Sequence, residues 1–129
     1  EKIGSVMGVT GRQTWSAAPR IAQYTISEMH STPEGGEAWG KERDRLKDLL
    51  VTRRNLLKEC CKQHGVPLNP THDGFFAWLE HNEPEVIAEK CAQQNVFLVP
   101  LTGGVRIGLC AVPLKQIPRV AEALANALK

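Results

Sequence analysis

One long helical pattern constrains the fold of this 129-residue chain more than any other feature. Between Glu37 and His64, apolar side chains recur at the spacing of an α-helix, namely Leu46, Leu49, Leu50, Leu56, Leu57, Cys60 and Cys61. Gly65 can adopt the left-handed conformation that ends a helix, and Pro67 prevents the helix from restarting. A helix of this length exceeds the diameter of a small domain's core. Two interpretations are open: a packed core helix, and a spine that connects two domains.

Beyond Gly65 the chain predicts five short elements. In order they are a strand of the buried type at Gly74–Leu79, a helix capped by Asn82 with Glu85 three residues later, strand Val96–Val99, a strand within Thr102–Pro113 and helix Leu114–Leu128. The last helix carries an apolar stripe, formed by Ile117, Val120, Ala121, Leu124 and Leu128. This order predicts a small sheet with helices on one face, a two-layer α+β arrangement.

The residues before the long helix read differently. They predict a strand at Lys2–Thr10, a helix at Thr14–Met29 in which Pro19 lies in the first turn or causes a kink, and a loop at His30–Gly36.

Arg106 is the residue that fold alone explains least. It lies in an apolar strand whose alternation puts three apolar side chains on one face, Val105, Ile107 and Leu109. Arg106 shares the other face with Gly108 and Cys110, which leave space beside the guanidinium. The planar guanidinium of arginine can bind one carboxylate through two parallel hydrogen bonds. We expect Phe75 or Phe76, from a neighbouring strand, to lie beside Arg106. The alternatives are an edge-strand arginine with its head in water, and two phenylalanines that are plain core.

Composition and motifs argue against several classes of function. Charges are interleaved with a net charge of +2, which predicts no nucleic-acid surface, and no apolar run approaches the roughly 20 residues of a membrane span. The cysteines form no CxxC pair and are expected to be reduced thiols of a cytoplasmic protein, with a Cys60–Cys61 redox pair as the alternative. The scattered histidines predict no metal site; they are His30, His64, His72 and His81. By themselves, the residues show no nucleophile or acid–base pair.

Several motifs follow one another in a specific order. They are GFFAWL at Gly74–Leu79, EPEVIAEKC at Glu83–Cys91, NVFLVP at Asn95–Pro100 and GGVRIGLCAVP at Gly103–Pro113. Upstream, EKIGS at Glu1–Ser5 is similar to an ERVGA segment, and MHSTPEGG at Met29–Gly36 is similar to a YSNPPxxG loop. Together they resemble the C-terminal part of a fold-type I, pyridoxal-phosphate-dependent aminotransferase of the aspartate/aromatic aminotransferase family. The resemblance covers nearly the whole chain and makes residues 1–36 the tail of the large cofactor-binding domain. Residues 37–129 become the interdomain helix and the small domain.

The resemblance implies roles for individual residues. Arg106 matches the arginine that grips the substrate α-carboxylate, and Phe76 matches an aromatic residue that lines the pocket. Lys2 stands where the family's arginine holds the cofactor phosphate, and lysine can bind phosphate only as a point charge. Ser27 stands near the place of the arginine that selects dicarboxylates. A neutral or aromatic substrate is therefore expected.

The resemblance also implies what the chain lacks. The chain has no initiator Met, and the family's Schiff-base lysine lies just upstream of the segment matched by Glu1–Ser5. We expect a fragment that is inactive alone, from a parent that acts on amino acids and 2-oxo acids with pyridoxal phosphate, as a cytoplasmic homodimer. The alternatives are a stand-alone α+β domain for amino-acid binding or interaction, and a relative that kept the fold and lost catalysis.

Overall fold

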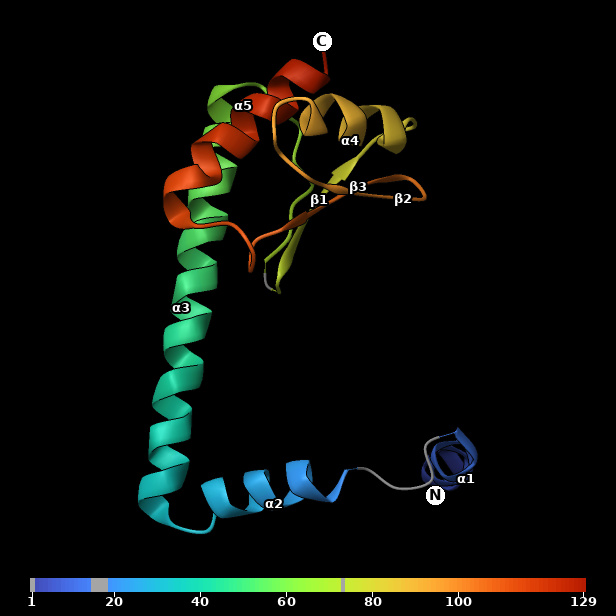
Figure 1. The fold of residues 1–129 in the computed structure, drawn as a ribbon, viewed down its shortest axis with the longest axis vertical. Coiled ribbons are helices and arrows are strands. Elements are labelled where there is room, and N and C mark those ends of the chain that lie inside the picture. Colours follow the sequence, from blue (N-terminus) through green and yellow to red (C-terminus); the bar gives the residue numbers. More distant parts are fainter. Residues whose placement is uncertain (1, 15–18, 73) are drawn as a thin grey trace. The chain divides into compact units, whose positions relative to one another are not determined.

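A computed structural model describes residues 2–14, 19–72 and 74–129 of the chain. It forms two compact units, Glu1–Asp44 and Arg45–Lys129, and the division falls within the long helix. The elements in chain order are α1 (Lys2–Thr14), α2 (Arg20–Met29), α3 (Pro33–Gln63), β1 (Phe76–Glu80), α4 (Pro84–Ala92), β2 (Val99–Leu101), β3 (Gly104–Gly108), the 3₁₀ helix η1 (Leu114–Gln116) and α5 (Ile117–Ala127) (Figure 1).

The first unit differs most from the sequence prediction. The predicted strand Lys2–Thr10 is wrong, because these residues belong to helix α1. The described residues of this unit contain no strand with which such a segment can pair. A helix satisfies its backbone N–H and C=O groups within its own segment, whereas an unpaired strand cannot.

The turn between α2 and α3 is shorter than predicted. The helix predicted at Thr14–Met29 begins only at Arg20, as α2, and Pro19 is its N-cap and not part of its first turn. Residues 15–18 lie outside the described residues. The loop predicted at His30–Gly36 ends at Thr32, because α3 already begins at Pro33. The Thr32 hydroxyl accepts a hydrogen bond from the Gly35 N–H at 3.1 Å, and proline is favoured in the first helical turn. This local cap extends the helix four residues earlier than its apolar pattern indicated.

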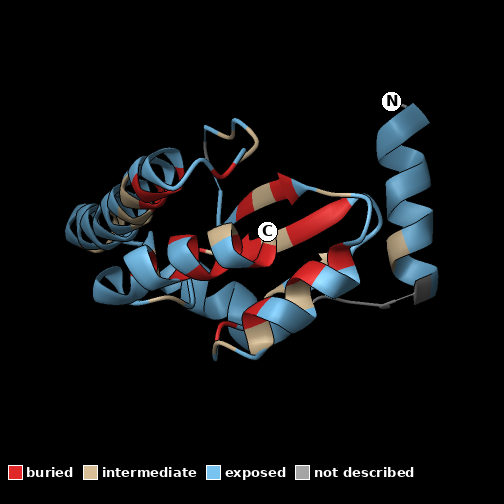
Figure 2. Ribbon diagram, turned by 90° about the horizontal axis from the view of Figure 1, so that it is seen from above, coloured by how far each residue is buried: buried red, intermediate tan, exposed pale blue. Residues whose placement is uncertain are grey.

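The second unit confirms the predicted α+β arrangement. Its three strands form an antiparallel sheet in the order β1-β3-β2, so β3 is central and pairs with both neighbours. Helices α4 and α5 cover one face of the sheet together with the C-terminal half of α3 (Figure 1). Buried residues line the strands and the inward helix faces (Figure 2). The predicted stripe of α5 is part of this core, with Ile117, Val120, Ala121 and Leu124 buried.

The end of α3 follows the sequence prediction. Gly65 has a φ of +70°, the left-handed conformation expected of it. The Val66 N–H donates to the Cys61 carbonyl at 2.8 Å, and the Gly65 N–H donates to the Lys62 carbonyl at 3.2 Å. These two bonds form a Schellman motif, which satisfies carbonyls that the helix end leaves open.

Other boundaries of the second unit differ from the prediction. The strand predicted at Val96–Val99 is displaced to Val99–Leu101. Residues after α4 form the helix-ending turn instead: Asn95 has a φ of 56°, and the Val96 N–H donates to the Cys91 carbonyl at 3.0 Å. Strand pairing can start only after this turn.

Two further details concern α4 and β1. The N-cap of α4 is Glu83 and not Asn82, and its side chain makes no capping hydrogen bond. Pro84 occupies the first turn, where its missing N–H leaves no helical bond unmade. The first predicted strand is not wholly buried: Phe75 and Phe76 are exposed, whereas Ala77 and Leu79 are buried. Only one face of β1 therefore contributes to the core.

Candidate functional site

Arg106 lies on the central strand of the sheet. It is paired with Trp78 of β1 on one side and with Val99 of β2 on the other. The edge-strand alternative is therefore wrong. The alternation predicted for β3 is confirmed, because Val105, Ile107 and Leu109 are buried, whereas Arg106 is half-buried. The arginine projects from the sheet face that the helices do not cover.

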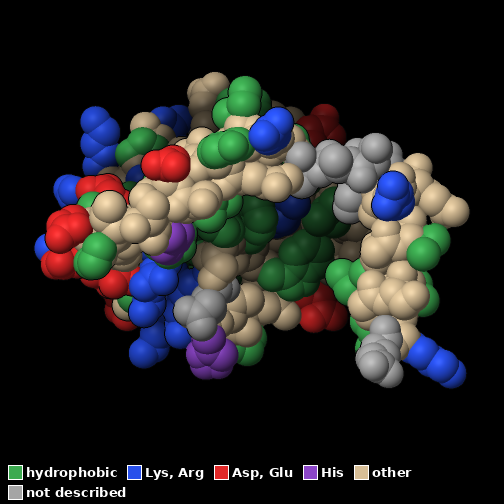
Figure 3. All heavy atoms as spheres, turned by 90° about the horizontal axis from the view of Figure 1, so that it is seen from below, with side chains coloured by type: hydrophobic (Ala, Val, Ile, Leu, Met, Phe, Trp, Pro, Cys, Tyr) green, Lys and Arg blue, Asp and Glu red, His purple; other side chains and the backbone are tan. Residues whose placement is uncertain are grey.

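The uncovered face is rich in apolar side chains. Phe76, Val99 and Leu101 are each about two-fifths exposed, at 43%, 42% and 43%. Hydrophobic side chains gather in the middle of this face when the molecule is seen from below (Figure 3). A guanidinium in such surroundings is less hydrated than one in open water, which strengthens its attraction for an anion.

Phe76 is the direct neighbour of the arginine head. The Arg106 Cζ lies 4.4 Å from the centroid of the Phe76 ring, a cation–π distance. The contact is diagonal across the strand pair, because Phe76 is in register with Gly108, two residues beyond Arg106. Gly108 carries no side chain, so the guanidinium can lie over the ring. The structure brings together the two predicted substrate-binding residues.

A pocket of about 460 Å³ opens beside this pair. It is lined by Arg106 and Phe76, by Val99 of β2, by Arg119 of α5, and by residues of the segments before β2 and after β3, among them Phe97, Cys110 and Val112. Its lining residues include two arginines and no carboxylate. The volume is typical of small-molecule sites, and the charge favours an anionic ligand with an apolar body.

The guanidinium of Arg106 is not neutralised by a carboxylate anywhere in the described parts of the chain. Arg119 is more engaged, because its Nη2 donates to the Gln94 carbonyl at 2.9 Å. Arg106 thus keeps its fork of donors for an incoming carboxylate.

Two arginines of α3, which the sequence pattern did not single out, hold the segments next to this site. Arg54 is 4% exposed and donates to the Thr71 hydroxyl, to the Gly74 carbonyl at 2.7 Å and to the Phe76 carbonyl at 3.5 Å. Arg53 donates from Nη1 to the carbonyls of Leu109 and Cys110, at 3.0 and 2.9 Å. No local signal identifies these contacts, because they join residues 17 to 57 positions apart.

The remaining predicted residues belong to the first unit. Lys2 is an exposed residue at the start of α1, and Ser27 is exposed on α2. The pocket of the second unit offers a guanidinium for a carboxylate but no lysine for a Schiff base with pyridoxal phosphate. The residues of the pocket therefore fit a substrate acid group and do not by themselves hold the cofactor.

The cysteines are all free. Burial, reinforced by the neighbouring Cys60, raises the pKa of Cys61 to about 11, and burial also raises the pKa of Cys91. Such thiols stay protonated near neutral pH, which opposes the redox-pair alternative for Cys60 and Cys61. Within residues 2–14, 19–72 and 74–129, no three His, Cys, Asp or Glu side chains are placed to share a metal ion.

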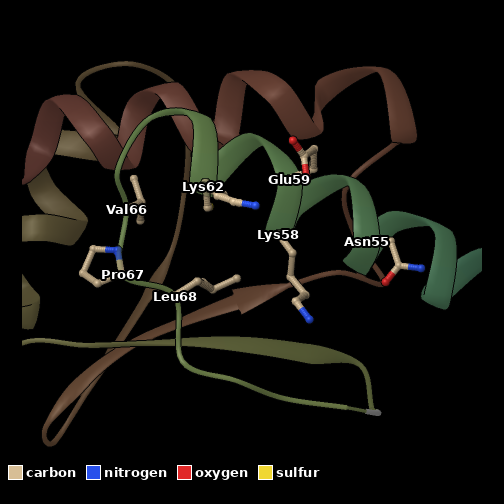
Figure 4. A pocket seen from close by; sticks show the side chains of 8 residues that line it. Asn55, Lys58, Glu59, Lys62, Val66, Pro67 and Leu68 are labelled. Carbon is tan, nitrogen blue, oxygen red and sulfur yellow. The ribbon is translucent and has the colours of Figure 1, made fainter.

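A second hollow, of about 500 Å³, lies between the end of α3 and the segment that follows it. Lys58 and Lys62 extend from the helix, and Val66, Pro67 and Leu68 form the facing wall (Figure 4). Glu59 is also part of the lining, so the charges are mixed. Its lysines are surface residues, and nothing in the lining selects one ligand. Helices long and apolar enough to cross a bilayer do not occur in the portion of the chain that the structure describes.

Comparison with known families agrees with this geometry. Residues 2–124 match the family model of aminotransferase class I and II. The chain belongs to this family. A search of curated proteins found no match.

Among solved structures, this aminotransferase chain is similar to the crystal structure of an aminotransferase from Anaerococcus prevotii DSM 20548. The TM-score is 0.86 at 22% sequence identity, over 97% of this chain and 30% of that one. At this identity the likeness shows the fold alone. The chain spans 30% of the length of that solved structure.

Proposed function

We propose that this chain is the carboxylate-binding, C-terminal part of an aminotransferase that moves an amino group between an amino acid and a 2-oxo acid. One observation carries the proposal. Arg106, on the central strand and over the Phe76 ring, borders a pocket whose lining includes no carboxylate. Membership of the aminotransferase family supports the reaction type.

In this proposal Arg106 binds the α-carboxylate of the substrate through two parallel N–H···O bonds. The Phe76 ring supports the guanidinium from one face and limits its orientation. Because β3 is paired on both sides, the arginine stands on a rigid element, which suits a group that must orient a substrate.

The substrate side chain is proposed to be neutral or aromatic. Phe97, Val99 and Val112 give the pocket an apolar lining. Ser27, near the position where a dicarboxylate-specific relative carries an arginine, cannot pair with a second acid group. Arg119 is the second cation in the lining of the pocket, and a second acid group would bind to such a cation. The binding of a dicarboxylate must therefore be compared directly with the binding of an aromatic acid.

The parent enzyme is proposed to use pyridoxal phosphate, which supplies the electron sink of amino-group transfer. Lys2 is proposed to contact the cofactor phosphate, and a lysine upstream of this chain to form the Schiff base. We also propose that residues 1–36 complete the cofactor domain, that residues 37–129 form the interdomain helix and small domain, and that the parent is a homodimer. Four free cysteines support a reducing, cytoplasmic location.

The test is a titration of the 129-residue chain with phenylpyruvate and with 2-oxoglutarate, followed by NMR. Arg106→Ala is expected to weaken phenylpyruvate binding about 10- to 100-fold, the value of a charge-assisted bidentate pair at about 1.5–3 kcal/mol. Arg43→Ala, at an exposed arginine outside the pocket lining, is the matched control and is expected to bind phenylpyruvate as the unaltered chain does. Binding that survives Arg106→Ala would remove Arg106 from the site, and tighter binding of 2-oxoglutarate would overturn the proposed substrate class.

A second assay addresses the fragment. With pyridoxal phosphate, an amino acid and 2-oxoglutarate, the chain is expected to show no turnover, because the lysine proposed to form the Schiff base is not one of these 129 residues. Measurable turnover would contradict this expectation.

The alternative function is amino-acid binding without catalysis. It is favoured by one observation, that every lining residue of the pocket lies within the second unit. Activity of the longer protein that contains this chain decides between the two: an aminotransferase loses turnover with Arg106→Ala, whereas a binding domain shows binding and no turnover in either form.

A further inference from the structure

Two consecutive arginines of α3 reach the backbone at the start of β1 and just after the end of β3. Arg54 donates to backbone carbonyls at Gly74 and Phe76, on the segment that leads into β1. Arg53 donates to the carbonyls of Leu109 and Cys110, just after β3.

The two held segments are themselves joined. The Leu109 N–H donates to the Phe75 carbonyl at 2.9 Å, beside the pairing of Phe76 with Gly108. The backbone next to the Arg106–Phe76 contact is therefore fixed on two sides. Arg54 binds it at Phe76, and Arg53 binds it at Leu109. A shift of either segment would change how the ring and the guanidinium meet.

The partners of these arginines are unusual for cations of which one, Arg54, is buried and the other, Arg53, is half-buried. Charged residues are rarely buried unless paired with an opposite charge. Within the described residues, Arg53 and Arg54 donate to carbonyls and one hydroxyl and have no carboxylate partner. A guanidinium with five donors can bridge three acceptors at fixed angles, which lysine cannot do. The geometry of these contacts, more than their charge, is what arginine supplies.

We infer that Arg53 and Arg54 are positioning residues for the carboxylate site: they hold the strand ends at which Phe76 supports Arg106. This inference rests on the proposed carboxylate site for its function, but the positioning itself is measurable without a ligand.

The readout is the shielding of the Arg106 side-chain protons by the Phe76 ring, seen in NMR spectra of the 129-residue chain. Arg54→Lys keeps the charge and removes the fork. We expect the shielding to be lost while the chain still unfolds cooperatively. We also expect about tenfold weaker phenylpyruvate binding, the size seen when residues that orient metal ligands are removed.

Lys90→Met is the matched control. The Lys90 Nζ donates to the Ala127 carbonyl at 3.0 Å, a comparable side-chain-to-backbone bond in the same unit, and neither residue lines the pocket. This variant is expected to leave the Arg106 shielding unchanged.

Arg53→Lys is the milder second variant, because it alters contacts to the end of β3 only. It is expected to reduce the shielding partly. Unchanged Arg106 signals in folded Arg54→Lys and Arg53→Lys would overturn the inference. Loss of the whole fold in both variants would overturn it too, since the arginines would then hold the unit and not the site.

The outcomes separate this inference from the proposed function. If Arg106→Ala binds phenylpyruvate as well as the unaltered chain, the proposed function fails, while lost shielding in Arg54→Lys still supports positioning. If Arg106→Ala abolishes binding and Arg54→Lys changes neither shielding nor affinity, the proposed function stands and the positioning role fails.

Discussion

The first unit exposes the apolar side chains of its helices, whereas the second unit buries those of its sheet and helices. Ile3, Met7 and Ile21 are 77%, 69% and 82% exposed, and α2 contains no buried residue. In the second unit, Leu57, Leu79 and Leu109 are fully buried at 0%. Apolar side chains therefore stabilise the second unit by packing together in a core. The helices of the first unit depend on hydrogen bonds within their own backbone.

The largest expected effect compares one buried and one exposed aliphatic residue. Leu57→Ala is expected to lower the free energy of unfolding by about 2–5 kcal/mol, because it removes buried methyl groups and leaves a cavity. Ile21→Ala should change it by no more than about 0.5 kcal/mol, as is usual for surface positions. Urea unfolding followed by tryptophan fluorescence measures both. Equal losses for the two variants would mean that the first unit also has a core.

Arginine offers a second contrast between the units. Arg54→Met is expected to cost about 1.5–3 kcal/mol, because it removes hydrogen bonds from a buried charged donor. Arg43, in the first unit, pairs with Asp44 at 3.2 Å with both side chains about 60% exposed, and such pairs contribute little. Arg43→Met should leave the urea midpoint unchanged. A comparable loss in the two variants would show that burial does not distinguish these arginines.

A third effect depends on pH and on the second unit alone, which holds all four cysteines. The pKa of Cys61 is raised from 9.0 to about 11, so the folded state retains a proton that the unfolded state releases. The stabilisation is complete below pH 9 and is lost as pH rises through 11, by about 2–3 kcal/mol. Urea unfolding between pH 8 and 11 measures this slope. The slope should be shallower in Cys61→Ala, and an identical slope would contradict the assignment.

The smallest effect is expected to have opposite signs in the two units. Gly65 has a φ of +70°, so Gly65→Ala should cost about 1 kcal/mol. Gly8 lies inside α1 with no atom near an added Cβ, so Gly8→Ala should favour the helix by about 0.5–1 kcal/mol. Urea unfolding measures the first change, and far-ultraviolet circular dichroism the second. A loss of helicity in Gly8→Ala would argue against the helical assignment of α1.

Prediction from the sequence succeeded where the signal was local or periodic. The stop of α3 at Gly65, the alternation of Val105 with Arg106 and the stripe of α5 all depend on residues a few positions apart. The ordered motifs also led to the aminotransferase family, which the comparison confirmed. Phe75 or Phe76 was expected beside Arg106, and the structure places Phe76 in contact with it.

The errors share a different cause. Lys2–Thr10 was predicted as a strand, but pairing depends on a partner that lies elsewhere in the chain. The strand predicted at Val96 moved because Asn95 adopts a helix-ending conformation. In the sequence, Arg54 is one of many charged residues of a long helix. No residue near it in the sequence indicates that its side chain reaches Gly74 and Phe76.

The sequence by itself determined the long helix, the two faces of the arginine strand and the family, because these follow from spacing, turn chemistry and ordered motifs. Only the tertiary structure decided that β3 is central, that a pocket opens beside Arg106 and that Arg53 and Arg54 hold the strand ends. Those features join residues tens of positions apart, and contacts at such separations follow from how the elements pack together.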